Sequence, residues 1–221
     1  MSRWGPTAVV VVLLAATAIA FATTERLKLK QTPFDVFPIT KVFSPLRGAA
    51  TIALRLRHPH RLTVQIVNSA HRLVATLARN EPFQPGTATF HWTGQNVPDG
   101  SYEPRITLDD GRVYNLPNQI RTDSVAPQVS LVSYRPHVLG RGRKPRVHIA
   151  YRLSELAHVI LYVNGHEVLF GGAKALRYKV DWYAKRNGQR LPRGRYQLQL
   201  AAIDLAGNLS PRTRTFIVRI R

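Results

Sequence analysis

The sequence predicts an all-β protein: two tandem antiparallel β-sandwiches preceded by an N-terminal hydrophobic helix. The first observation is a succession of short runs in which apolar and polar residues alternate, which is typical of half-buried strands. The second is a skeleton of residues that occurs twice, in Phe90–Leu108 and again in Val180–Leu200. The third is an uncharged apolar run from Ala8 to Ala22 near the N-terminus.

The alternating runs follow one another at the spacing of a sandwich. After the N-terminal run, no long segment of the sequence carries a helical period. Turn-forming residues such as Asn68-Ser69 and Pro98-Asp99-Gly100 separate the runs. In the first half we expect strands at Thr51–Leu56, Leu62–Val67, Leu73–Leu77, Thr87–Trp92 and Tyr102–Leu108. Several short strands at this spacing indicate an antiparallel sandwich.

The repeated skeleton consists of a Trp, a polar turn, a Pro, a Gly two residues later and then a Tyr. Polar positions differ between the copies, because Arg193 stands where the first copy has Asp99. We therefore interpret the shared residues as the structural signature of a duplicated domain, with each Trp in a core beside its Tyr. The matching pairs are Trp92 and Trp182, Gly100 and Gly194, and Tyr102 and Tyr196.

A further turn motif stands near the C-terminus, where Asp204 and Asn208 flank Leu-Ala-Gly. These side chains readily bond nearby backbone, so we expect the pair to tie the turn, with Ca²⁺ binding as the alternative. The two residues belong to the same structural signature. Other acids are also expected to cap their own turns: Asp99, Asp109, Asp110 and Asp123.

The repeat divides the chain into four segments. Residues 1–24 are expected to form a signal anchor or signal peptide, and residues 25–33 a basic juxtamembrane tether. Residues 34–123 and 124–221 are expected to form the two sandwiches. The junction is Asp123–Pro127, where the proline restricts the backbone of its neighbour and supplies no donor. We therefore expect a stiff hinge and two sandwiches placed end to end.

Several stretches of both halves match one known domain type. In the first half they include Phe43–Pro45, Leu62–Asn68 and Val97–Tyr102; in the second half they include Leu191–Tyr196 and Ala202–Ser210. On these residues each half resembles the Ig-like (fibronectin-III-like) domain of the flagellar hook-capping protein FlgD. That domain type also occurs in bacterial envelope and secreted proteins. The resemblance implies an Ig-like fold for each sandwich and says little about function, because one sandwich serves many roles.

The chain departs from that family in three respects. Relatives commonly have Asp after the Trp, where this chain has Thr93 and Tyr183. Relatives often open the second domain with an acidic, glycine-rich turn. This chain has the basic stretch Val138–Pro145 there, so the resemblance implies no Ca²⁺ site at that turn. Its N-terminus is also unlike that of a protein exported through the flagellar apparatus, so a flagellar role is not expected.

The N-terminal apolar run is typical of export. It is shorter than the roughly 20 residues of a full membrane span, so it suits a short signal anchor or a signal peptide cleaved after Ala22. Arg3 and the amino terminus on one side nearly balance Arg26, Lys28 and Lys30, offset by Glu25, on the other. We expect a single-pass membrane protein with its C-terminal domains outside the cytoplasm, or a secreted one if the segment is cleaved. Arg26, Lys28 and Lys30 are the expected membrane-surface contacts.

Basic residues dominate the composition. The chain has 32 Lys+Arg against 12 Asp+Glu, a formal net charge of +20. Such a field favours polyanionic partners. The sharpest cluster predicts a polyanion contact, with a solvated basic loop as the alternative, and comprises Arg141, Arg143, Lys144 and Arg146. No aromatic residues interleave with it as they do in RNA-binding modules, so nucleic acid is not the favoured partner.

No catalytic or cofactor-binding pattern is present in the sequence. The absence of cysteine excludes disulfides, thiolate metal sites and a cysteine nucleophile. The motifs of serine hydrolases, P-loop proteins and zinc proteases are also absent. His58-Pro-His60 lacks companion ligands, so we expect no metal and no cofactor. A hydrolase would require two acids that converge in a cleft.

These observations favour a non-catalytic, exported and membrane-anchored cell-envelope protein. It would act as a structural or binding module through basic sandwich surfaces. The expected partners are anionic wall polymers, lipid headgroups, or an envelope protein recruited by strand addition; no small-molecule substrate is inferred. The alternative is a membrane-tethered, cytoplasm-facing nucleic-acid-binding protein, which the nearly balanced flanking charges also permit.

Overall fold

The computed structural model describes residues 33–117, 119–140, 145–172 and 175–221. In these residues the regular structure is entirely β-strand, which confirms the predicted all-β class. The predicted N-terminal helix, residues 1–24, lies outside the described residues. Within the described part of the chain, no helix is long and apolar enough to cross a membrane.

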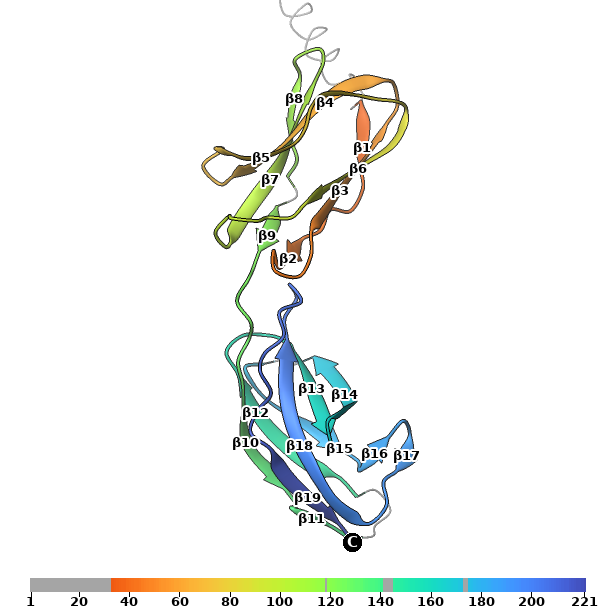
Figure 1. The fold of residues 1–221 in the computed structure, drawn as a ribbon, viewed down its shortest axis with the longest axis vertical. Helices are drawn as coiled ribbons and strands as arrows, with labels where there is room; N and C mark the ends of the chain where they lie inside the picture. The colour runs from red at the N-terminus through yellow and green to blue at the C-terminus, as the bar shows by residue number, and fades with distance from the viewer. Residues whose placement is uncertain (1–32, 118, 141–144, 173–174) are drawn as a thin grey trace, which may run out of the picture.

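The first sandwich is built from nine strands (Figure 1). In chain order they are β1 (Phe34–Val36), β2 (Val42–Phe43), β3 (Ala50–Leu56), β4 (His60–Asn68), β5 (Leu73–Phe83), β6 (Gly86–Trp92), β7 (Gly100–Leu108), β8 (Val113–Asn115) and β9 (Ile120–Thr122). One sheet has the order β1-β3-β6, and the other has the order β2-β9-β7-β4-β5, with β8 added beside β7. Only β2 and β9 run parallel among these described neighbours.

The second sandwich repeats this order. Its strands are β10 (Val129–Arg135), β11 (Val138–Leu139), β12 (Val147–Leu153), β13 (His158–Val163), β14 (His166–Gly172), β15 (Arg177–Trp182), β16 (Lys185–Arg186), β17 (Gln189–Arg190), β18 (Gly194–Ile203) and β19 (Phe216–Ile220). One sheet is β10-β12-β15 and the other is β11-β19-β18-β13-β14, with β11 parallel to β19. The β16-β17 hairpin is an addition that the first sandwich lacks within its described residues.

Alternation of side chains creates the two cores. In β3, Ala50, Ile52 and Leu54 are fully buried, while the residues between them face outward. The matching strand β12 buries Val147 and Ile149 in the same way. The buried residues of the first core lie between Phe34 and Ile120, and those of the second lie between Leu139 and Val218. Each sandwich therefore encloses its own apolar cluster.

The repeated signature forms one packing unit in each core. The rings of Trp92 and Tyr102 meet edge to face at 4.9 Å, and those of Trp182 and Tyr196 at 6.3 Å. The hydroxyl group of Tyr102 donates a hydrogen bond to the carbonyl oxygen of Pro98 at 2.6 Å. The Tyr196 hydroxyl makes the equivalent bond to Pro192 at 2.8 Å. A tyrosine bonded to backbone a few residues upstream is the tyrosine corner of immunoglobulin-like sandwiches.

One strand is longer than the sequence indicated. We predicted a strand at Leu73–Leu77, but β5 continues to Phe83 through register shifts against β4. Asn80 takes a left-handed backbone conformation with φ of 49°, and its N–H bonds the Thr63 hydroxyl at 3.0 Å. This bulge interrupts the alternation of side chains, which hid the rest of the strand from a pattern of period two.

The two sandwiches lie end to end along the long axis of the molecule (Figure 1). The chain passes from β9 to β10 through a short linker between them. Strands β11 and β19 approach the far end of the second sandwich, where residue 221 lies. The molecule therefore has a junction in its middle and a distal end formed by the second sandwich.

Candidate functional site

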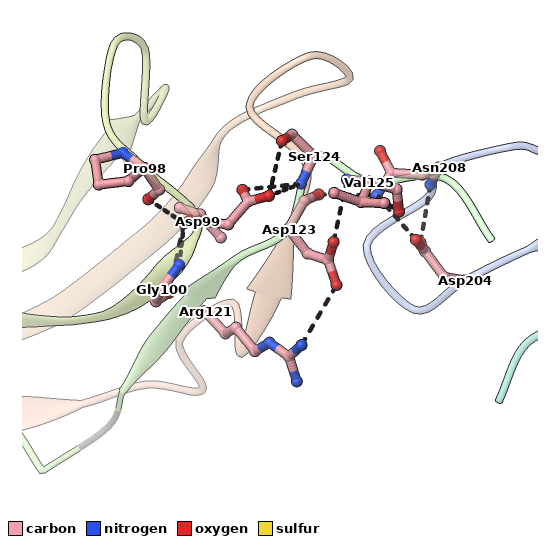
Figure 2. Close-up of polar contacts among 10 residues, drawn as sticks. Pro98, Asp99, Gly100, Arg121, Asp123, Ser124, Val125, Asp204 and Asn208 are labelled. Atoms are coloured by element: carbon pink, nitrogen blue, oxygen red, sulfur yellow. Dashed lines mark hydrogen bonds and ion pairs between the residues drawn. The ribbon is translucent and has the colours of Figure 1, made fainter. Parts of the chain in front are cut away.

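Two regions of the second half gather charged side chains: the junction with the first sandwich and the distal end. At the junction, the Asp99 carboxylate accepts hydrogen bonds from both the backbone N–H and the hydroxyl of Ser124 (Figure 2). The three distances are 2.9, 3.0 and 2.8 Å. Asp99 belongs to the turn before β7, whereas Ser124 begins the linker. The first sandwich therefore holds the start of the linker through a charged acceptor.

The second sandwich holds the same linker from the other side. The Asn208 side-chain amide donates to the carbonyl oxygen of Asp123 at 2.8 Å and to that of Val125 at 3.3 Å. Asn208 is 3% exposed, and it is itself held by the Asp204 carboxylate through its backbone and side-chain N–H groups. A direct bond between the sandwiches runs from the Ser44 N–H to the Ala206 carbonyl at 3.1 Å. The junction is thus bonded from both sides.

Three carboxylates converge at this junction. Oxygen atoms of Asp123, Glu155 and Asp204 lie within 4.8 Å of one another. Burial raises the pKa of Glu155, and the charges of Asp123 and Asp204 raise it further, while Arg121 acts in the opposite direction. Carboxylate oxygens suit hard cations, but Ca²⁺ takes about six to eight oxygen ligands. Both Asp204 oxygens already accept hydrogen bonds from Asn208, so the geometry supports a structural role for the cluster.

The distal end of the second sandwich is strongly basic. Residues 182–200 contain five cationic residues and no acid: Lys185, Arg186, Arg190, Arg193 and Arg195. A depression of about 210 Å³, here called the distal pocket, lies at this end. Its lining includes Arg190, Arg193 and Arg221, with Tyr183, Pro192 and Ile220 as apolar wall. Three arginines from two parts of the chain, residues 190–193 and residue 221, therefore line one small space.

The acid nearest in sequence to this end is already engaged. Asp181 forms an ion pair with Arg146 at 3.3 Å and with His148 at 2.6 Å. A hydrogen bond with Tyr183 and the charge of Asp181 hold the pKa of Arg146 above its usual value. Among the described residues, neither Arg193 nor Arg221 has an acidic partner. The distal pocket thus keeps a strong positive field.

A second basic depression lies on the sheet β10-β12-β15. It is open, has a volume of about 650 Å³, and is lined partly by Arg152, Arg177 and Lys179. Arg152 and Arg177 lie directly opposite each other in register. Like charges placed opposite each other on neighbouring strands are unfavourable. This surface is shallow and bordered by fewer arginines than the distal pocket.

The residues predicted as contacts are only partly within the described structure. Arg141, Arg143 and Lys144 lie outside the described residues, as do Arg26, Lys28 and Lys30. Arg146 is described and is paired with Asp181. Gly140 and Pro145, which flank the undescribed part of the basic loop, both line the distal pocket. Sequence reasoning therefore found the neighbourhood of this pocket and missed Arg190, Arg193 and Arg221.

The acids expected to cap turns divide into two groups. Asp110, Asp123 and Asp204 do accept a backbone N–H of their own turn. For Asp99 the expectation is wrong, because its carboxylate bonds the linker. Asp109 pairs with His60 at 3.0 Å, and this hydrogen bond lowers the pKa of the aspartate. Both partners lie far away in sequence, so a local pattern could not reveal them.

Comparisons with known proteins assign neither a family nor a function to the chain. No protein-family model matches the sequence, and no curated protein matches it. Among solved structures, the fibronectin(III)-like modules of Clostridium thermocellum CbhA have a TM-score of 0.48 at 15% identity, covering 85% of this chain and 94% of that one. The periplasmic chaperone SfaE gives 0.34 at 12% identity, covering 85% and 98%. Murine CEACAM1b gives 0.36 at 11% identity, with the same coverage. No functional conclusion follows from likenesses of this size.

Proposed function

We propose that the protein is a non-catalytic, membrane-anchored cell-envelope module that binds anionic polymers through its basic surfaces. Its two sandwiches are proposed to be of the FlgD type, on the residues of the repeated skeleton. The observation that carries the proposal is the distribution of charge between the junction and the distal end of the second sandwich. Asp123, Glu155 and Asp204 lie at the junction, whereas residues 182–200 at the distal end are basic and contain no acid.

The arrangement of the molecule supports a role in reaching away from a surface. An N-terminal anchor, if it holds the chain in a membrane, precedes the first sandwich, and the basic end belongs to the second. The Asp99 carboxylate accepts a hydrogen bond from the linker and the Asn208 amide donates one to Asp123, so the path of the linker is held at both ends. A bonded linker keeps the two sandwiches in one line, so the basic end is presented at a distance from the anchor.

Cellular orientation is the first test. A reporter joined to the C-terminus, active only outside the cytoplasm, is expected to be active in living cells. A matched fusion that is active only in the cytosol is expected to be silent. The opposite pattern would refute the envelope role and favour the cytoplasm-facing nucleic-acid-binding alternative.

Binding across a salt series is the second test. The full chain in neutral detergent is expected to bind an anionic polymer more tightly than anionic vesicles or DNA of equal charge. All three affinities should fall with salt, because contacts between ions are screened. Equal affinity for all three would mean attraction by net charge alone. No binding to the polymer at low salt would remove the proposed function.

A further inference from the structure

We propose that the distal pocket and the arginine row that extends from it bind a linear phosphodiester polymer, one phosphate in the pocket and the next along the row. This inference rests on the proposed function and names its site and ligand class. The pocket is lined by Arg190, Arg193 and Arg221. Arginine binds phosphate through two parallel hydrogen bonds, which gives geometry as well as charge.

The size of the pocket favours part of a polymer over a whole small molecule. Its volume of about 210 Å³ is below the roughly 300–1,000 Å³ of pockets that enclose a complete small ligand. One phosphate with part of its linker fits such a space, and the rest of the ligand must continue over the rim. Tyr183, Pro192 and Ile220 supply an apolar wall for the carbon atoms beside the phosphate.

A second pair of arginines lies on β18 and β19, close to the pocket. Arg195 of β18 and Arg219 of β19 are directly opposite in register, and both are exposed. Arg193 stands just before β18 and Arg221 just after β19, each two residues from this pair, so the pair lies beside the rim of the pocket. Two residues of a strand span on the order of 7 Å. The row therefore presents two cationic steps at a spacing that suits successive phosphates of one chain.

The row also places two like charges opposite each other, as Arg152 and Arg177 are placed on the sheet β10-β12-β15. Two arginines directly opposite each other repel, and no acid among the described residues pairs with Arg195 or Arg219. An anion lying between them removes this repulsion. A polymer is favoured over the headgroups of the anchoring membrane because the row lies on the second sandwich, whereas the proposed anchor precedes the first sandwich in the sequence.

The test uses the full chain in neutral detergent and fluorescent poly(glycerol phosphate) oligomers as the probe. The double variant Arg193→Ser with Arg221→Ser should lose about tenfold or more in affinity, since charge-assisted hydrogen bonds are lost. The matched control, Arg152→Ser with Arg177→Ser, removes the same charge from the sheet β10-β12-β15. It should change affinity by no more than about twofold, as surface charges screened by salt do. Equal losses in both variants overturn the pocket while leaving polyanion binding intact.

Two further variants separate geometry from charge. Arg193→Lys keeps the charge but loses the planar guanidinium group with its paired donors. This variant should therefore bind the oligomers less tightly than wild type. Longer oligomers should bind wild type more tightly than short ones, and Arg195→Ser with Arg219→Ser should remove this dependence on length. If the dependence on length survives this change, the row does not bind the polymer.

The choice of polymer is tested with other anions. Tighter binding to an oligothymidylate with the same number of phosphates, or to phosphatidylglycerol vesicles, would refute that choice. Failure of wild type to bind any probe removes the proposed function itself. Thermal unfolding of each variant checks that the sandwiches are intact.

Discussion

The side-chain amide of Asn208 donates a hydrogen bond to the backbone carbonyl oxygen of Asp123 at 2.8 Å, across 85 residues of sequence. Asn208 belongs to the turn after β18, and Asp123 ends the first sandwich. The same amide group also donates to an Asp204 oxygen at 2.8 Å. Asn208 itself is almost fully buried, so its amide group depends on these protein acceptors for its hydrogen bonds. A turn of the second sandwich thus fixes the path by which the chain enters that sandwich.

Replacement of Asn208 by Ala should loosen the junction and weaken the second sandwich. The change removes three donated bonds of the amide and leaves acceptors at Asp123 and Asp204 without them. Loss of a partner from a buried acceptor costs about 1–3 kcal/mol. Denaturant unfolding of residues 33–221 measures this cost, and residual dipolar couplings measure the spread of orientations between the sandwiches. Asn68→Ala, in a turn of the first sandwich, is the control. It should lower stability without widening that spread.

Replacement of Asp99 by Asn should weaken the first sandwich's hold on the linker. The carboxylate accepts three hydrogen bonds from Ser124, and an amide can accept fewer at this position because its nitrogen is a donor. Since Asp99 is exposed, we expect a loss of about 1 kcal/mol. Faster amide hydrogen exchange at Ser124 is the direct measurement. Asp110→Asn, another exposed turn residue, should leave that exchange rate unchanged. An unchanged rate in the Asp99 variant would contradict the proposed hold.

The tyrosine corners should contribute equally to the two sandwiches. Tyr102→Phe and Tyr196→Phe each remove one hydroxyl bond, to Pro98 and Pro192, while the rings keep their packing against tryptophan. Each loss should lower the free energy of unfolding of its own sandwich by about 0.5–1.5 kcal/mol. Tryptophan fluorescence during denaturant unfolding follows each core through Trp92 or Trp182. A substitution that destabilises the other sandwich instead would show that the two do not unfold as separate units.

The fold was predictable because the sequence features that indicate it lie close together in the chain. The Trp, Pro, Gly and Tyr of each copy lie within a short stretch, and their turn and ring packing depend mainly on neighbours in sequence. Alternation likewise marks strands such as β3 and β12, whose inward residues are apolar. The parallel pairs β2–β9 and β11–β19 could not be predicted. In each pair one strand, β2 or β11, has only two residues and therefore shows no alternation.

The site was less predictable because its residues meet only through pairing of distant strands. Arg193 and Arg221 lie 28 positions apart in the sequence and line one pocket because β18 and β19 run antiparallel. The basic loop was visible as a run of neighbouring cations, and its flanks do border that pocket. The three junction carboxylates come from the linker and two separate turns, so Asp123 and Asp204 looked like ordinary turn residues and no local pattern singled out Glu155.

Glu155 should make stability at the junction depend on pH. Burial and the charges of Asp123 and Asp204 raise its pKa in the folded protein above the usual value for a glutamate. A raised pKa means that the folded state binds this proton more tightly than the unfolded state. Its contribution to stability is therefore fully present below the unfolded pKa and is lost as pH rises through the higher folded pKa.

Glu155→Gln removes this ionisation and should therefore remove the loss of stability that accompanies it as pH rises. The variant should be more stable than wild type near about pH 7, with the difference shrinking towards zero near about pH 3, where the glutamate is protonated in both states. Chemical unfolding of residues 33–221 across this range gives the difference at each pH. Glu167→Gln, an exposed glutamate of β14, removes the same charge away from the junction and corrects for the effect of net charge. A Glu155→Gln curve that stays parallel to wild type at every pH would show that the three carboxylates do not repel one another in the folded protein.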